Sequence, residues 1–365
     1  MSDVRPGDGA DRSDATTADL DAAVAAGIVS ADQARRLGVF FAERRRGSDS
    51  VPMPADPSAD EENVRFVTSF NDVFVTLGIL LLVGAVAFLG AKTSLLVAAT
   101  ASVVVVWALS EVFSRHWRMA FPSIVLTAGL VGAGGIAGAQ AAEAVGLGHG
   151  GGGIAAGVTA VALGFAHWRR FGVPISVAAA VAGAATTLFA VLHATVPTLV
   201  DRHPSPVMLV VGLAVFALAM RWDSSDRQRR TRRTDVAFWL HILAAPLIVH
   251  PLVSATGTAL GDIRPDGAAI ILALFAGLAF VALVVDRRAL LVSGLIYLGA
   301  TIGTLIERLG WAAASSGPLA AGAVGAVVLV LAIGWTPLRA LALRLVPASL
   351  RALVPEPRSL HGRTP

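Results

Sequence analysis

Ten apolar runs follow one another between residues 73 and 335, and the short loops between them carry almost all of the charge. Each run has about 17–25 residues, and a helix needs about 20 apolar residues to cross the hydrocarbon core of a bilayer. A surface helix of a soluble protein would show a polar stripe, and barrel strands would alternate in polarity. Neither pattern occurs, so the sequence predicts an all-α, polytopic transmembrane helix bundle.

The predicted spans contain few charged residues, and Glu111, at the end of the second span, is the clearest exception. The spans are Val73–Ala91, Ser94–Phe113, Met119–Ala141, Gly151–Trp168, Val173–Val196, Ser205–Met220, Val236–Ala255, Gly267–Val285, Ala289–Ile306 and Trp311–Trp335.

The basic residues predict how the chain is threaded. If the N-terminus is cytoplasmic, 25 of the 29 Lys and Arg residues fall on the cytoplasmic side. Only Lys92, Arg202, Arg264 and Arg308 fall on the other side. This asymmetry fits the positive-inside rule, so we expect both termini to be cytoplasmic. A single lysine among many arginines, with abundant alanine, is typical of a GC-rich bacterial genome and favours the bacterial inner (cytoplasmic) membrane.

The composition also excludes several classes of partner and cofactor. The net charge of +4 does not predict nucleic-acid binding, because the basic groups flank the membrane while residues 1–72 are acidic. The basic loop Arg221–Arg233 is instead expected to contact anionic lipid headgroups. Cysteine is absent, which excludes disulfides and thiolate metal sites. No cofactor is expected, no signal peptide opens the sequence, and the oligomeric state is not predicted.

Outside the spans, composition and capping signals divide the chain further. Two capping boxes, Thr16 with Asp19 and Ser30 with Gln33, predict a helical pair, and Gly27 can end its first helix. Leucines and arginines between Leu338 and Val354 predict two short amphipathic helices separated at Pro347. The predicted segments are a disordered tail at 1–15, a cytoplasmic helical pair at 16–47, a flexible linker at 48–63, a transmembrane domain at 64–335 and a cytoplasmic amphipathic tail at 336–365.

Three stretches resemble a known family. AAGIVSADQARRLGVFF (Ala25–Phe41) resembles the short helical segment that opens the DUF2157 group of predicted bacterial membrane proteins. RFVTSFNDVFVTLGILLLVGAVAFLG, which enters the first span, and WTPLRALALRLVPASLRALVP, which follows the last, are also similar to such proteins. The resemblance implies a small cytoplasmic segment followed by closely spaced spans. That family has no known function, so the resemblance implies no catalytic residues.

No catalytic motif is present: the sequence lacks HExxH, GxSxG, Walker A and a strand-to-helix GxGxxG. An enzyme is therefore not predicted. Glycines spaced four apart, Gly134 with Gly138, Gly153 with Gly157 and Gly299 with Gly303, are interpreted as contacts between closely packed membrane helices, with a flexible gate as the alternative.

Polar residues at membrane depth are the candidate transport path, because they are costly there without partners. The outer-side candidates are His250, His193, Glu143 and Glu307, with Gln140 nearby, while Glu111 and His241 fall toward the inner side. In the seventh span, Pro246 and Pro251 each free a backbone carbonyl, at Ile242 and Leu247, and predict a broken helix. The alternative is that the carboxylates reach headgroup water and the histidines form hydrogen bonds within the bundle.

Two functions follow. The first is a secondary transporter of a small solute, since ten short spans with small loops match the size of drug and metabolite exporters. The second is a non-transporting membrane scaffold or sensor, in which the N-terminal helical pair meets cytoplasmic partners.

Overall fold

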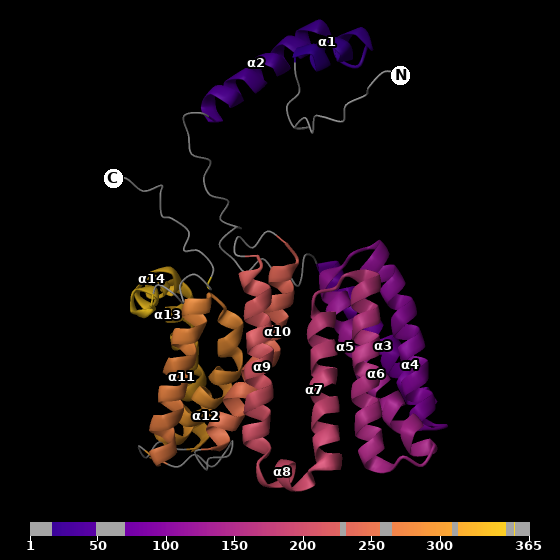
Figure 1. Cartoon of the computed structure of the whole chain (residues 1–365). Helices are drawn as coiled ribbons and strands as arrows, with labels where there is room; N and C mark the ends of the chain where they lie inside the picture. The colour runs from indigo at the N-terminus through magenta and orange to yellow at the C-terminus, as the bar shows by residue number, and fades with distance from the viewer. Residues whose placement is uncertain are drawn as a thin grey trace, which may run out of the picture. The chain divides into compact units, whose positions relative to one another are not determined.

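A computed structural model describes residues 17–48, 70–226, 231–255, 265–308, 313–347 and 354. The chain divides into two compact units, Met1–Val64 with Ser359–Pro365, and Arg65–Arg358. The described residues form helices and no strand, which confirms the predicted all-α class (Figure 1).

The first unit contains α1 (Thr17–Ala25) and α2 (Ala31–Ser48). The predicted capping box of α2 is confirmed: the amide of Gln33 donates to Ser30 Oγ at 3.2 Å, and the amide of Ser30 donates to Gln33 Oε1 at 2.8 Å. Gly27 ends α1 as predicted, with a φ of +70° that favours glycine. Of the predicted segments, residues 1–15 and 49–63, together with the capping residue Thr16, lie outside the described residues.

The second unit has ten described helices long and apolar enough to cross a membrane, and each matches one predicted span. The protein is therefore a multi-pass membrane protein. The ten helices are α3 (Phe70–Ala91), α4 (Leu95–Ser110) with its π-helical extension η2 (Glu111–His116), α5 (Ala120–Ala144), α6 (Gly148–Phe171), α7 (Ile175–Thr195), α9 (Pro204–Ser224), α10 (Arg233–Ser254), α11 (Pro265–Val285), α12 (Leu291–Arg308) and α13 (Ala313–Ile333).

The structure adds three features to the predicted spans. The second span does not end at Phe113 but continues through η2 to His116. A short helix, α8 (Pro197–Arg202), connects α7 to α9. The tenth span ends before Trp335, where a separate helix, α14 (Trp335–Leu345), begins; Pro337 lies in its first turn, where proline is tolerated. This helix is the first part of the predicted amphipathic tail, and residues 348–353 lie outside the described residues.

The seventh span, α10, is not broken. It is one helix from Arg233 to Ser254 with Pro246 and Pro251 inside it. Each proline removes only one backbone donor, and packing on several sides supports the helix across both positions. α10 contacts α9, α7 and α12, and 56% of its most apolar window is buried, the largest share among the ten described spans.

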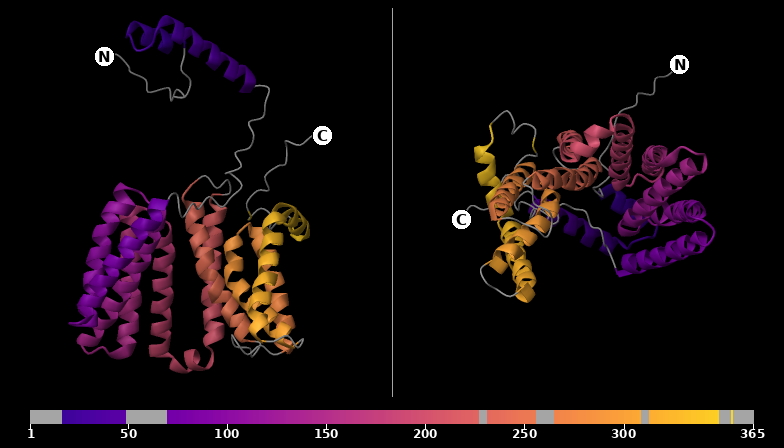
Figure 2. Two further views of the ribbon diagram at one scale, coloured as in Figure 1. Left: turned by 180° about the vertical axis from the view of Figure 1, so that it is seen from behind. Right: turned by 90° about the horizontal axis from the view of Figure 1, so that it is seen from below.

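Two groups of helices lie side by side in the second unit (Figure 2). We call α3–α7 the N-half and α9–α14 the C-half, and α10 of the C-half packs against α7 of the N-half. We call the end of the bundle that holds Arg115, Arg170, Arg232 and Arg287 the arginine-rich end, because hydrogen bonds from Arg170, Arg232 and Arg287 join neighbouring helices there.

Glycine brings the N-half helices close together, as predicted. A Cβ on Gly157 of α6 would lie 2.8 Å from the carbonyl oxygen of Gly183 on α7, and one on Gly138 would lie 2.7 Å from the carbonyl oxygen of Ala155. At Gly299 and Gly303 of the C-half, an added Cβ would make ordinary contacts of 3.5 and 3.7 Å. The predicted pair Gly299 and Gly303 is therefore not closely packed, but close glycine packing does occur in the C-half, where a Cβ on Gly212 of α9 would lie 2.8 Å from the carbonyl oxygen of Leu247 on α10.

Candidate functional site

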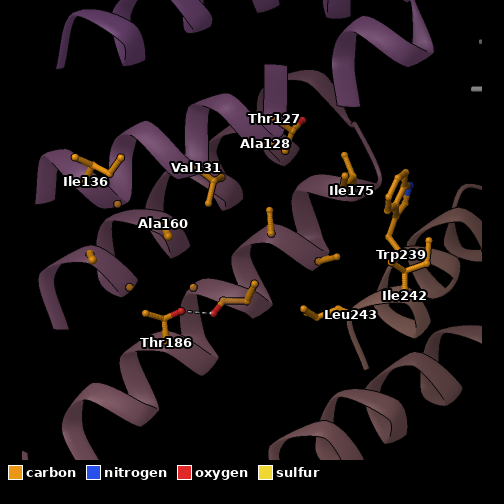
Figure 3. A pocket seen from close by; sticks show the side chains of 18 of the residues that line it. Thr127, Ala128, Val131, Ile136, Ala160, Ile175, Thr186, Trp239, Ile242 and Leu243 are labelled. Carbon is orange, nitrogen blue, oxygen red and sulfur yellow. Dashed lines mark hydrogen bonds between the residues drawn. The ribbon is translucent and has the colours of Figure 1, made fainter. Parts of the chain in front are cut away.

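A groove of about 740 Å³ lies between the two halves, with walls from α5, α6, α7 and α10 (Figure 3). Its volume is within the range of small-molecule sites, about 300–1,000 Å³. Most of its lining residues are glycine, alanine or larger apolar residues, and none is charged. They are Thr127, Ala128, Val131, Gly132, Gly135, Ile136, Ala139, Ala156, Gly157, Ala160, Ile175, Ala178, Ala179, Ala182, Gly183, Thr186, Trp239, Ile242, Leu243 and Pro246.

Few polar groups face the groove. The hydroxyl of Thr186 donates to the carbonyl oxygen of Ala182 at 3.0 Å, so its proton is already used within α7 (Figure 3). Across the groove, α10 contributes Trp239, Ile242 and Pro246. Because Pro246 has no amide hydrogen, the carbonyl of Ile242 lacks its usual donor four residues later. The groove thus offers apolar surface, an indole ring and very few hydrogen-bonding groups.

A buried polar cluster, which we call the His167 cage, lies at the arginine-rich end of the N-half. Its members are His167 of α6, Ser110 of α4, Thr127 of α5 and Ser176 of α7. His167 Nδ1 is 2.8 Å from Ser176 Oγ and 3.4 Å from Thr127 Oγ1, and Nε2 is 3.3 Å from Ser110 Oγ. The His167 side chain has no solvent exposure. Thr127 belongs both to this cage and to the wall of the groove.

Two aromatic rings cover the cage. The ring of Phe171 lies 4.6 Å from the His167 ring, and the indole of Trp107 lies 6.4 Å away at nearly a right angle. Beyond them, at the surface, Arg170 donates two hydrogen bonds to the Glu111 carboxylate, at 2.8 and 3.1 Å, and Arg115 donates a third at 3.2 Å. A surface pocket of about 550 Å³ is lined there by Glu111, Arg115, His116 and Arg118.

The C-half holds a different cluster at the same end, which we call the Asp223 clasp. Arg287, at the end of α11, donates two hydrogen bonds to the carboxylate of Asp223 on α9, one of them 3.1 Å long, and a third of 3.2 Å to the carbonyl oxygen of Thr234 on α10. Both charged side chains are about 1% exposed. His241 of α10 lies 3.9 Å from the same carboxylate and bonds to the Ala237 carbonyl at 2.7 Å.

The four polar side chains of the predicted transport path are not brought together. Each has a nearby partner of its own: Glu143 bonds to Gln140 and His149, His193 is 3.5 Å from Asp201, His250 is 2.6 Å from the hydroxyl of Tyr297, and Glu307 accepts from Ser316. Of the two prolines, Pro246 lines the groove and Pro251 is buried within the C-half.

Sequence reasoning missed the residues that the structure does bring together. His167 was overlooked because it lies near the end of a span beside Arg169 and Arg170, where a polar residue is expected. Its cage partner Ser110 is 57 residues away, and Asp223 is 64 residues from Arg287. The cage residues share one signal, because each is a serine, threonine or histidine within about two turns of the same membrane end.

Among the described residues, no group of three histidine, aspartate or glutamate side chains is placed to hold a metal ion.

Comparisons with protein families, with curated proteins and with solved structures find no match to this chain. The resemblance to the DUF2157 group therefore stays a prediction.

Proposed function

We propose that this multi-pass protein is a secondary transporter of a small, largely apolar solute, which binds in the groove between the N-half and the C-half. The observation that carries the proposal is the groove itself: a volume of about 740 Å³, walls from both halves, and no charged lining residue. A charged solute would lose its hydration there without gaining a counter-charge, which costs several kcal/mol. An apolar solute gains about 25 cal/mol for each Å² that it buries.

The position of α10 supports movement as well as binding. α10 carries one wall of the groove and also packs against α9 and α12, so a shift of the C-half relative to the N-half would change the width of the groove. Transporters commonly bind their solute between two sets of helices that rock against one another. The transporter class is the one that the sequence predicted. The proposed solute site keeps Ile242 and Pro246 of the seventh span but does not include His250 or the outer carboxylates.

We further propose that the arginine-rich end is cytoplasmic and that the membrane is a bacterial inner membrane. The 25-to-4 division of basic residues supports this orientation. Topology reporters fused after Arg170 and after Arg233 should report the cytoplasm, and a fusion at His149 should report the opposite side. A reporter after Arg233 that gives a periplasmic signal would contradict the orientation.

The alternative function, a scaffold or sensor, is favoured by one observation on α1 and α2. Ile28, Leu37 and Val39 are exposed on this small pair, and such apolar side chains can bind a partner. Deleting residues 1–48 separates the two functions, because a transporter should keep its transport phenotype and a scaffold should lose its effect.

The groove is tested by two matched substitutions on α7. Ala182 lines the groove, whereas Ala184 is exposed on the same helix and does not line it. In a deletion strain, metabolites of low polarity should change in amount between cells and medium. Wild type and Ala184→Trp should restore the profile, and Ala182→Trp should not. An unchanged profile on deletion, or full restoration by Ala182→Trp, would contradict the proposal.

A further inference from the structure

The His167 cage places one ionisable ring between the apolar groove and the polar surface pocket. On one side, Thr127 is 3.4 Å from His167 Nδ1 and lines the groove. On the other side, Ser110 is 3.3 Å from Nε2 and is followed in the chain by Glu111, which lines the surface pocket. Four membrane helices, α4 to α7, each contribute one side chain to this arrangement.

The hydroxyl directions are compatible with a neutral His167. Ser110 donates its proton to the Val106 carbonyl at 2.8 Å, and Thr127 donates to the Ser123 carbonyl at 2.8 Å. Both oxygens therefore offer only lone pairs to the ring. Nε2 carries the hydrogen and donates to Ser110, and Nδ1 accepts from the Ser176 hydroxyl at 2.8 Å. Every polar hydrogen of the four cage side chains is then donated in a hydrogen bond.

The cage can also accommodate a second proton. If Nδ1 gains a hydrogen, it donates to Ser176 Oγ, and the Ser176 hydroxyl turns toward Thr127 Oγ1, 3.5 Å away on the wall of the groove. The aromatic rings of Phe171 and Trp107 stay beside the imidazole in both protonation states, because neither forms a hydrogen bond with it. One proton is bound and one hydroxyl turns, with no other bond changed.

The charged groups around the cage are few, and the carboxylate among them is paired. From α4 and η2 come Glu111, Arg115 and His116, and from α6 come Arg169 and Arg170; Glu111 is held by Arg115 and Arg170. α5 and α7 carry their only ionisable side chains, Glu143 and His193, near the opposite end. No carboxylate is among the described hydrogen-bond partners of His167, so the stability of its charged form depends on how polar the surroundings of the cage are.

We propose that His167 is the proton-binding site of the transporter and that proton and solute bind antagonistically, as in an antiporter. An apolar solute that fills the groove surrounds this side of the cage with apolar groups and so disfavours the charged ring. By linkage, protonation of His167 must weaken the binding of the solute by the same factor. The inference rests on the proposed function, because it assigns a regulating group to the same groove.

The test uses the full chain in lipid nanodiscs and the uncharged fluorescent probe N-phenylnaphthylamine. Wild-type protein should bind the probe well at pH 8 and more weakly as the pH falls, by up to tenfold per pH unit below the transition, because one proton competes. Calorimetry in buffers of different ionisation enthalpy should show release of a proton when the probe binds within the transition. His167→Gln should bind the probe with an affinity that does not change between pH 4 and 8.

The outcomes separate this inference from the proposed function. If wild-type binding does not depend on pH, or if His167→Gln keeps the pH dependence, the proton site is not His167. If Ala182→Trp binds the probe as well as Ala184→Trp does, the groove is not the site and the proposed function fails. Should His167→Gln not fold, Thr127→Val serves instead, because loss of the groove-side hydroxyl should reduce the pH dependence while the ring stays in place.

Discussion

The N-half and the C-half each bury a polar cluster at the arginine-rich end, but they satisfy it in different ways. The Asp223 clasp joins α9, α10 and the segment after α11 through two full charges that are hydrogen-bonded to each other. In the His167 cage, no full charge is buried: two of the three hydroxyls bond to carbonyls of their own helices, and only the ring depends on its neighbours. A charged pair of this kind fixes helix positions, whereas a neutral cage can change its proton content without separating helices.

The largest expected effect comes from breaking the Asp223 clasp. Arg287→Met leaves a buried carboxylate without its counter-charge, which costs about 3–5 kcal/mol. The double variant Asp223→Leu with Arg287→Met removes both charges and should recover most of the loss. Thermal unfolding in detergent measures the stability of both variants. A double variant as unstable as Arg287→Met would show that the unpaired charge does not cause the loss of stability.

The second expected effect compares a closely packed glycine, Gly157 of the N-half, with a loosely packed one, Gly303 of the C-half. Gly157→Ala forces α6 away from α7 and should cost about 1–3 kcal/mol, since an added Cβ has no room there. Gly303→Ala, in an ordinary contact, should be neutral or stabilise α12 by up to about 1 kcal/mol. Equal effects of the two substitutions on thermal unfolding would show that the close contact at Gly157 does not stabilise the protein.

A smaller effect is expected from replacing the histidine of the cage. His167→Phe fills a similar volume and leaves Ser110 and Thr127 bonded to their own helices, so only the Ser176 hydroxyl loses its nearest partner. The cost should be about 1–2 kcal/mol. Loss of stability as large as that of Arg287→Met would mean that the cage, like the clasp, is primarily structural.

The smallest effect on stability is expected at the basic loop, whose predicted role is to bind lipid. The loop after α9 and the start of α10 carry arginines, of which Arg229 and Arg230 lie outside the described residues. Replacing Arg229, Arg230, Arg232 and Arg233 by glutamine should weaken binding to anionic vesicles by on the order of 1 kcal/mol per charge near the surface. Stability should change little, and an unchanged preference for anionic lipid would refute the predicted headgroup contact.

The sequence predicted what depends on one helix at a time. Apolar length predicted the ten spans, and local signals predicted the Ser30 cap and the end of α1 at Gly27. Contacts between helices could not be predicted in the same way. A membrane helix is apolar on every side, so its sequence carries little information about which face meets a neighbour. The groove is the extreme case, since the alanines and glycines of its wall resemble those of any span.

The central claim is that an apolar solute binds between the halves, and the position of a bound probe tests it most directly. The chain has no cysteine, so a single nitroxide label can be attached at Ile136→Cys, on the exposed rim of the groove, or at Gly84→Cys, in open space on α3. Nitroxides quench nearby fluorophores. We predict strong quenching of bound N-phenylnaphthylamine by the label at position 136 and weak quenching by the label at position 84. Equal quenching at both positions would place the probe in the surrounding lipid and contradict the account.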